Sequence, residues 1–278
     1  MQVAERAMAE YSKRNRIYYV ESPLLREHDC VVHAFCSRCG GVSSGRFSDF
    51  NFSVREGDST EAVRENWAML SRAFAIPVDR FYTVNQVHED RVLAIGDDHV
   101  PEAGEAQRGY DAIITNRRGL AVGVKTADCV PILVFDSVQH VVGVVHAGWK
   151  GTSLQVAAKA IDVLIRQFDS RAENLVVAIG PAIGSCCYEV DAVVYEAMRA
   201  SSEWQVCARR SHRAGRWMLD LSKVNKLQMI ARGVPPENIS SFRICTSCHT
   251  DMFYSHRGEE GHTGRQLSFI MLQGGGRE

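Results

Sequence analysis

Three apolar segments follow one another closely in the middle of the chain, and they constrain its fold more than any other feature. They cover residues 120–126, 130–136 and 141–146, and each is almost uninterrupted in its apolar character. Runs of this length are typical of strands, and a strand without polar alternation is usually covered on both faces. The sequence therefore predicts a core sheet that is buried between other layers.

Helical periodicity and capping signals predict the elements around this sheet. Asp58 and Glu61 form a capping-box-like start, and a helix after Gly151 is expected to begin at Thr152 or Ser153. The predicted helices cover 58–77, 152–168, 191–200 and 220–232. Further strands are predicted at 31–36, 81–87, 91–95, 111–115, 174–179, 244–246 and 267–272. We expect an α+β fold of mixed β-sheets flanked by helices, in a single globular domain that spans 1–278, with a core of about 30–272 and a charged N-terminal extension at 1–16.

Composition and charge argue against several classes of partner. The chain has 278 residues, is 45% hydrophobic and carries a formal net charge of -1, so it has no large basic field for nucleic acid or for a membrane surface. Residues 1–16 lack the apolar stretch of a secretory signal, and no apolar run approaches the roughly 18 residues of a membrane helix. We expect a cytoplasmic protein that acts on small molecules.

Nine cysteines without a secretory signal indicate reduced thiols rather than a disulfide framework. We interpret Cys30, Cys186, Cys187 and Cys207 as small buried hydrophobic residues. The pairs Cys36-x-x-Cys39 and Cys245-x-x-Cys248 could form a structural zinc site, but they are separated by far more than the about 15–20 residues of a zinc ribbon. That interpretation is therefore not favoured.

His88, Cys129 and His146 each lie at or just past the end of a predicted strand, where one sheet could bring them together. Two imidazoles and one thiolate suit zinc, and three protein ligands leave the fourth position for water. Copper is an alternative, but the axial methionine of a blue-copper site is absent from these three motifs. Two other interpretations stay open: a hydrolase with Cys129 as nucleophile, and a core cysteine beside hydrogen-bonded histidines.

Six motifs spread over the chain resemble a known family. They read FCSRCGGVSSGRFSDFNFS, NQVH, TADCVPILVFD, HAGWKGT, IGPAIGSCCYEV and CTSCHTDMFYSHRGEEGHTGRQLSFIML. The chain is similar to the YfiH-like laccase-domain family, also called multicopper polyphenol oxidases and purine nucleoside phosphorylases. The resemblance implies a zinc ion on His88, Cys129 and His146, phosphorolysis of adenosine, inosine and methylthioadenosine, and deamination of adenosine. It also leaves copper-dependent phenol oxidation as an alternative.

Each reaction needs further groups besides the metal ligands. Deamination requires a base for the water that attacks purine C6, and Asp128 is the nearest candidate, with a cap of the loop turn as its structural alternative. Phosphorolysis requires cationic donors for phosphate, and our candidates are Arg38, Arg257 and Arg265. The expected partners are therefore purine nucleosides and phosphate.

Overall fold

The three central apolar segments form strands in the computed structural model, which describes residues 11–96, 104–199 and 204–274. They are β7 (Ala121–Thr126), β8 (Val130–Asp136) and β9 (Val141–Ala147). β8 and β9 pair in antiparallel fashion, but β7 belongs to a different sheet, so the prediction of one core sheet from all three was wrong. The segments still share one core, because the two sheets face each other.

The first sheet has the strand order β1-β2-β3-β15-β7-β4, and the second has the order β14-β10-β8-β9-β6-β5. Both sheets mix parallel and antiparallel pairs, as β4 runs parallel to β7 and β10 runs parallel to β14. The other strands of the first sheet are β1 (Ser12–Arg14), β2 (Ile17–Val20), β3 (Val31–Cys36), β4 (Phe81–Thr83) and β15 (Gln266–Leu272). Those of the second are β5 (Val92–Ile95), β6 (Ala112–Thr115), β10 (Leu175–Ile179) and β14 (Ile239–Ser241).

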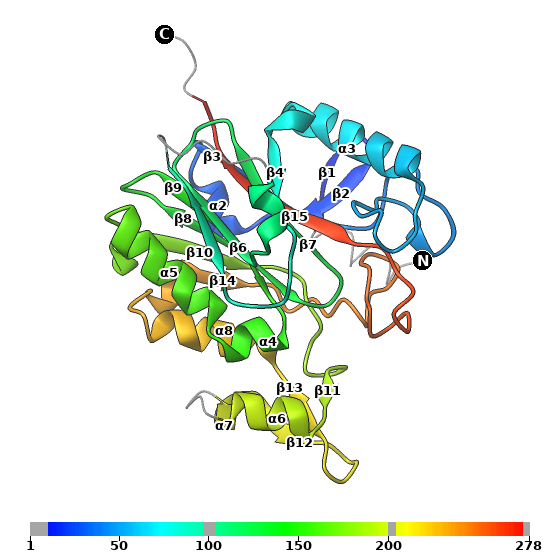
Figure 1. Ribbon diagram of the computed structural model, residues 1–278, viewed down its shortest axis with the longest axis vertical. Helices are drawn as coiled ribbons and strands as arrows, with labels where there is room; N and C mark the ends of the chain where they lie inside the picture. The colour runs from blue at the N-terminus through cyan, green and yellow to red at the C-terminus, as the bar shows by residue number, and fades with distance from the viewer. Residues whose placement is uncertain (1–10, 97–103, 200–203, 275–278) are drawn as a thin grey trace.

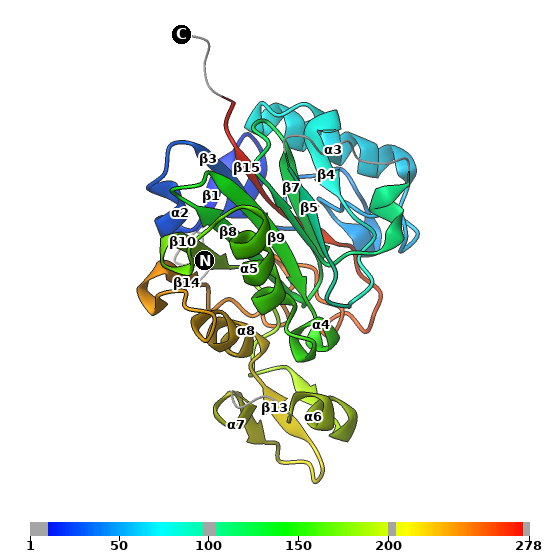
Figure 2. The ribbon, with the colours of Figure 1, turned by 60° about the vertical axis from the view of Figure 1, so that its left-hand side comes forward.

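The two sheets pack face to face, and helices cover their outer faces (Figures 1 and 2). Along β8, Leu133 and Phe135 point into the core between the sheets, whereas Val134 points to the helical side. α3 (Thr60–Phe74) covers the first sheet, and α5 (Val156–Gln167) and α8 (Leu221–Ile230) cover the second. This architecture confirms the prediction of mixed sheets flanked by helices. In the described part of the chain, no helix is both long and apolar enough to cross a membrane.

A small third sheet extends below the two large ones in Figure 1. Its strands follow the order β11-β13-β12, and two short helices accompany it. The sequence analysis predicted one of the helices, α6, whose N-cap Asp191 accepts hydrogen bonds from the backbone of Val193 and Val194. The elements are β11 (Glu189–Val190), α6 (Ala192–Met198), α7 (Trp204–Cys207), β12 (Ala208–Arg210) and β13 (Trp217–Leu219).

Several predicted boundaries were wrong for identifiable reasons. α3 is capped by Ser59, whose Oγ accepts from the backbone N–H of Ala62, and not by Asp58. Thr152 lies inside a short helix, α4 (Trp149–Ser153), because its N–H bonds to the carbonyl of Gly148; α5 begins after Gln155. The predicted strand at 244–246 contributes only an isolated bridge.

The predictions for the N-terminal segment and for the burial of the cysteines also need correction. Of the extension at 1–16, residues 1–10 lie outside the described residues, while 12–14 form strand β1. The short helix α2 (Pro23–Arg26) was not predicted. Cys207 is buried as expected, but Cys30 is only half-buried. Cys186 is exposed and Cys187 is half-buried, because both lie in a surface loop after β10.

Candidate functional site

The structure brings His88, Cys129 and His146 together although they are far apart in the chain. Their ligand atoms all lie within 4.8 Å of one another. His146 is on β9, and Cys129 precedes β8, so the antiparallel pairing of these strands places the two side chains next to each other. His88 comes from the loop between β4 and β5, and its ring centroid is 4.8 Å from that of His146. Three separate segments thus converge on one point.

Asp111, which the sequence analysis did not identify, holds two of these segments in place. Its buried carboxylate lies 2.7 Å from Nδ1 of His146 and accepts hydrogen bonds from the backbone N–H groups of His88 and Glu89, at 3.0 and 2.7 Å. These bonds hold His88 in a left-handed conformation with φ of 60°. They also leave Nε2 of His146 free to face an ion, the usual arrangement of a metal-binding histidine.

The electrostatics of the site favour a thiolate at Cys129. Burial alone raises the pKa of this thiol, but the adjacent His146 and His88 outweigh burial and lower it. Burial likewise lowers the pKa of His146, whereas the charge of Cys129 and the bond to Asp111 raise it overall. The thiolate is the form of cysteine that binds soft metals or acts as a nucleophile.

The shape and the donors of this site fit a zinc ion. A Cβ on Gly148 would lie 3.0 Å from Sγ of Cys129 and 3.2 Å from Cδ2 of His88, so glycine keeps the space between the ligands free. Two nitrogen donors and one sulfur donor, with a carboxylate behind one imidazole, are a familiar zinc set. None of the described residues that line the adjacent cavity is a methionine, so the axial methionine of a blue-copper site is not present there.

The three ligand candidates lie on the wall of a cavity of about 770 Å³. This volume is within the range of small-molecule sites. Arg257, Arg265 and Asp128 also line this cavity, whereas Arg38 does not. The lining also includes His256 and further cationic and aromatic groups that were not predicted as site residues, namely Arg55, Lys125, Trp149, Tyr188 and Arg216.

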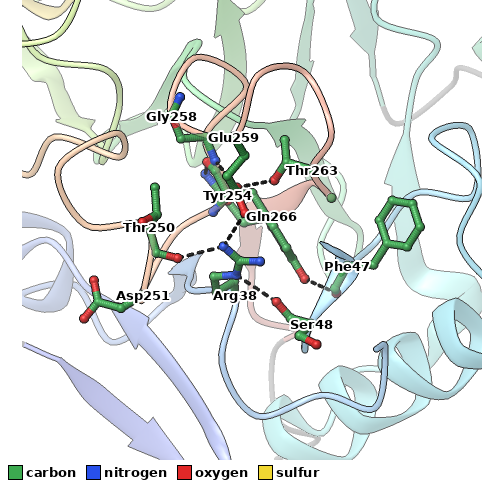
Figure 3. Close-up of polar contacts among 12 residues, drawn as sticks. Arg38, Phe47, Ser48, Thr250, Asp251, Tyr254, Gly258, Glu259, Thr263 and Gln266 are labelled. Atoms are coloured by element: carbon green, nitrogen blue, oxygen red, sulfur yellow. Dashed lines mark hydrogen bonds and ion pairs between the residues drawn. The ribbon is translucent and has the colours of Figure 1, made fainter. Parts of the chain in front are cut away.

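Arg38 is engaged elsewhere, as Figure 3 shows. Its Nε donates to the carbonyl of Ser48 at 2.7 Å, and its Nη1 donates to the carbonyl of Thr250 at 2.7 Å. The same nitrogen pairs with Glu259 at 2.9 Å, and the guanidinium lies over the ring of Tyr254. Arg38 thus ties the loop after β3 to the loop before β15.

The carboxylate of Asp128 is nearly buried and has three hydrogen-bond donors. Its Oδ1 accepts from the hydroxyl groups of Thr246 and Ser255 at 2.6 and 2.7 Å, and its Oδ2 accepts from the N–H of Arg257 at 2.6 Å. Asp128 itself has φ of 90°, a conformation that is costly for a residue with a side chain. These bonds connect the turn before Cys129 to the loop at 246–257.

The comparisons with known proteins agree with this geometry. The family model described as multi-copper polyphenol oxidoreductase laccase matches residues 32–273. The chain belongs to this family. A crystal structure of the hypothetical protein YfiH from Bacillus licheniformis has a TM-score of 0.85 and 31% identity, and the match covers 95% of this chain and 99% of that one. Both findings confirm the family and the α+β fold expected from the motifs.

Two curated relatives carry the names of enzymes. A purine nucleoside phosphorylase from Bacteroides thetaiotaomicron is 32% identical, over 95% of this chain and 99% of its own length. An adenosine deaminase named RL5, from an unknown prokaryotic organism, is 31% identical, over 86% of this chain and 93% of its own. These relatives confirm the prediction that the laccase-domain chain is an enzyme.

Proposed function

We propose that the chain is a zinc-dependent purine nucleoside enzyme. Its reactions would be phosphorolysis of adenosine, inosine and methylthioadenosine, and deamination of adenosine. The observation that supports this most is the position of His88, Cys129 and His146 on the wall of a nucleoside-sized cavity that also presents cationic side chains. The relatives' names supply the class of substrate.

In this proposal the metal ligands are His88, Cys129 and His146, the last through Nε2. A zinc ion held by these residues would supply Lewis-acid polarisation of a reacting oxygen. Asp111 would keep the imidazole of His146 in the orientation that binds the ion, since its carboxylate is hydrogen-bonded to Nδ1 of that ring. Gly148 would keep the space beside the sulfur free.

Phosphate would bind at Arg265 and Lys125. Two bonds already position the Arg265 guanidinium: Nη1 donates to the carbonyl of Gly264 at 2.8 Å, and Nη2 pairs with Glu56 at 3.1 Å. Burial, followed by the charge of Arg55, lowers the pKa of Lys125. Because a bound anion would relieve the repulsion between Lys125 and Arg55, this cluster suits phosphate better than a neutral ligand.

Arg257 and Asp128 would shape another part of the cavity wall. The Arg257 guanidinium donates to the carbonyl of Glu189 at 3.0 Å and lies 5.3 Å from the ring centroid of Tyr188, which offers an aromatic face for a purine. Asp128 stays a candidate base. Its three hydrogen bonds favour the alternative that it positions the loops, because they already occupy both carboxylate oxygens.

A cysteine hydrolase is a second candidate, and one observation favours it. The Asp111 carboxylate contacts the His146 imidazole, which in turn contacts the Cys129 thiol. This is the arrangement of an orienting acid, a base and a nucleophile. The nearby imidazole of His88 has no role in that mechanism, whereas it completes the ligand set of a metal site. Hydrolysis of an activated ester by zinc-free protein at the rate of the holoenzyme would support the hydrolase.

The test is product analysis with adenosine, with and without phosphate, on protein of measured zinc content. Adenine and ribose 1-phosphate that form only with phosphate indicate phosphorolysis, and inosine indicates deamination. The proposal is wrong if fully zinc-loaded protein turns over none of the three nucleosides. Copper-dependent oxidation of a phenol without nucleoside turnover would instead support the oxidase.

A further inference from the structure

Four cysteines gather at a second place in the molecule, away from the ligand set described above. Cys186 and Cys187 lie in the loop after β10, and Cys245 and Cys248 lie in the loop after β14. A parallel bridge between Ala182 and Cys245 joins these loops. As a result, all four Sγ atoms lie within 4.8 Å of one another.

The distances between these sulfurs are those of atoms that share an ion. Sγ of Cys248 is 3.3 Å from Sγ of Cys187 and 3.6 Å from Sγ of Cys186. Four sulfurs placed tetrahedrally at about 2.3 Å from zinc are about 3.8 Å apart, whereas a disulfide is about 2.05 Å long. All four cysteines are free thiols.

The backbone at Gly184 donates a hydrogen bond to one of these sulfurs and leaves space for another. The N–H of Gly184 donates to Sγ of Cys245 at 3.2 Å, a bond that favours the thiolate. A Cβ on Gly184 would lie 3.2 Å from Sγ of Cys186 and 3.2 Å from Cβ of Cys245, so a side chain there would press on the cluster.

We propose that Cys186, Cys187, Cys245 and Cys248 form a second metal site, a four-thiolate site for a soft divalent cation of the zinc class. Four protein ligands leave no open position, so this site is structural and does not bind substrate. It explains the Cys245-x-x-Cys248 pair, whose partner is the adjacent pair at 186–187 and not the one at 36–39.

Both loops that carry the four cysteines are hydrogen-bonded to Asp128, the residue before Cys129. Thr246, between two of the ligands, donates to Asp128, and the N–H of Ile183, in the other loop, donates to the backbone carbonyl of Asp128. The ion would clamp both loops and so hold the turn that presents Cys129. The clamp itself does not depend on which reaction the enzyme catalyses.

The experiment measures zinc per chain by mass spectrometry in the full-length protein, purified under reducing conditions with zinc. We expect two zinc ions in the wild type, one in Cys248→Ser, and two in the control Cys30→Ser, whose thiol is half-buried outside both clusters. Cys129→Ser should keep one ion, at the four-cysteine site. A Cys248→Ser protein with as much zinc as the wild type would overturn the proposal.

X-ray absorption at the zinc edge of the wild-type protein tests the site even if a cysteine variant does not fold, because it counts the sulfur neighbours of the bound zinc directly. In the wild-type protein, the mean number of sulfur neighbours per zinc should be well above the single sulfur of the Cys129 site, and in Cys129→Ser the remaining zinc should have four sulfurs at about 2.3 Å. A wild-type mean of one sulfur per zinc, or a disulfide among the four cysteines of reduced protein, would contradict the four-thiolate site.

Discussion

The two donor clusters that we propose as metal sites differ in ways that would separate a catalytic site from a structural one. The site of His88, Cys129 and His146 has mixed nitrogen and sulfur donors and borders a cavity. Its residues come from the loop between β4 and β5, the turn before β8 and the end of β9. The four-cysteine cluster has sulfur donors alone, lies on surface loops and contributes no residue to that cavity. A site with three protein ligands leaves room for a reactant, whereas a site with four ligands joins chain segments.

Loss of a ligand at the three-residue site should have the largest effect. We expect Cys129→Ser to lower kcat/KM for adenosine on the order of 10³-fold, because the Lewis acid is lost with its thiolate. Steady-state kinetics and zinc content should be measured on the same preparation. If Cys129→Ser had the activity and the zinc content of the wild type, the three-residue site would not be the catalytic metal site, and the contrast between the two clusters would be wrong.

Loss of the orienting carboxylate should have the next largest effect. Asp111→Asn is expected to lower zinc affinity or activity by about 10- to 100-fold, since the amide holds the imidazole of His146 less firmly. The matched control is Asp136→Asn, another fully buried carboxylate, which accepts from the backbone of Val138 and Gln139. An equal loss of activity in both variants would indicate general destabilisation and contradict the orienting role.

Replacing a cationic side chain of the cavity should affect phosphate more than the nucleoside. We expect Arg265→Gln to raise KM for phosphate about tenfold with a smaller change in KM for adenosine, because one charge-assisted contact is lost. Arg38→Gln is the comparison, since Arg38 bonds to the protein itself and lies outside the cavity. The assignment fails if the two variants change the phosphate dependence equally.

The smallest effect on catalysis should come from the four-cysteine cluster. Cys248→Ser is expected to lower Tm by about 5–10 °C and to change kcat only a few-fold, because the clamp acts on stability and only indirectly on Cys129. Differential scanning calorimetry with and without added zinc would measure this. Zinc should raise Tm less in Cys248→Ser than in Cys30→Ser.

Local patterns predicted much of the fold, and the sequence motifs indicated which donor side chains would lie close together. The strand at 31–36 was correct at both ends, because polar and turn-forming residues flank a segment that is apolar apart from His33. The assignment of β7 to the wrong sheet has a physical cause: strands buried on both faces look alike whichever sheet they join. The family motifs pointed to His88, Cys129 and His146 together, and the fold brings their donor atoms within 4.8 Å of one another.

Other site residues could not be predicted, because their roles depend on contacts across the chain. Asp111 looked like the first residue of a strand, and only the fold shows that its carboxylate meets His146. Arg38 looked like a phosphate ligand until its bonds to Ser48 and Thr250 were seen. The four-cysteine cluster joins loops about 60 residues apart, so no local spacing rule detects it.

The most direct test of the account is an anomalous difference map at the zinc edge from crystals of the full-length protein. Our account predicts two peaks. One should lie between His88, Cys129 and His146, with an open side toward the cavity, and the other should lie at the centre of Cys186, Cys187, Cys245 and Cys248. A map of zinc-loaded protein with no peak among the first three residues would contradict the central claim that they form the metal centre of this enzyme.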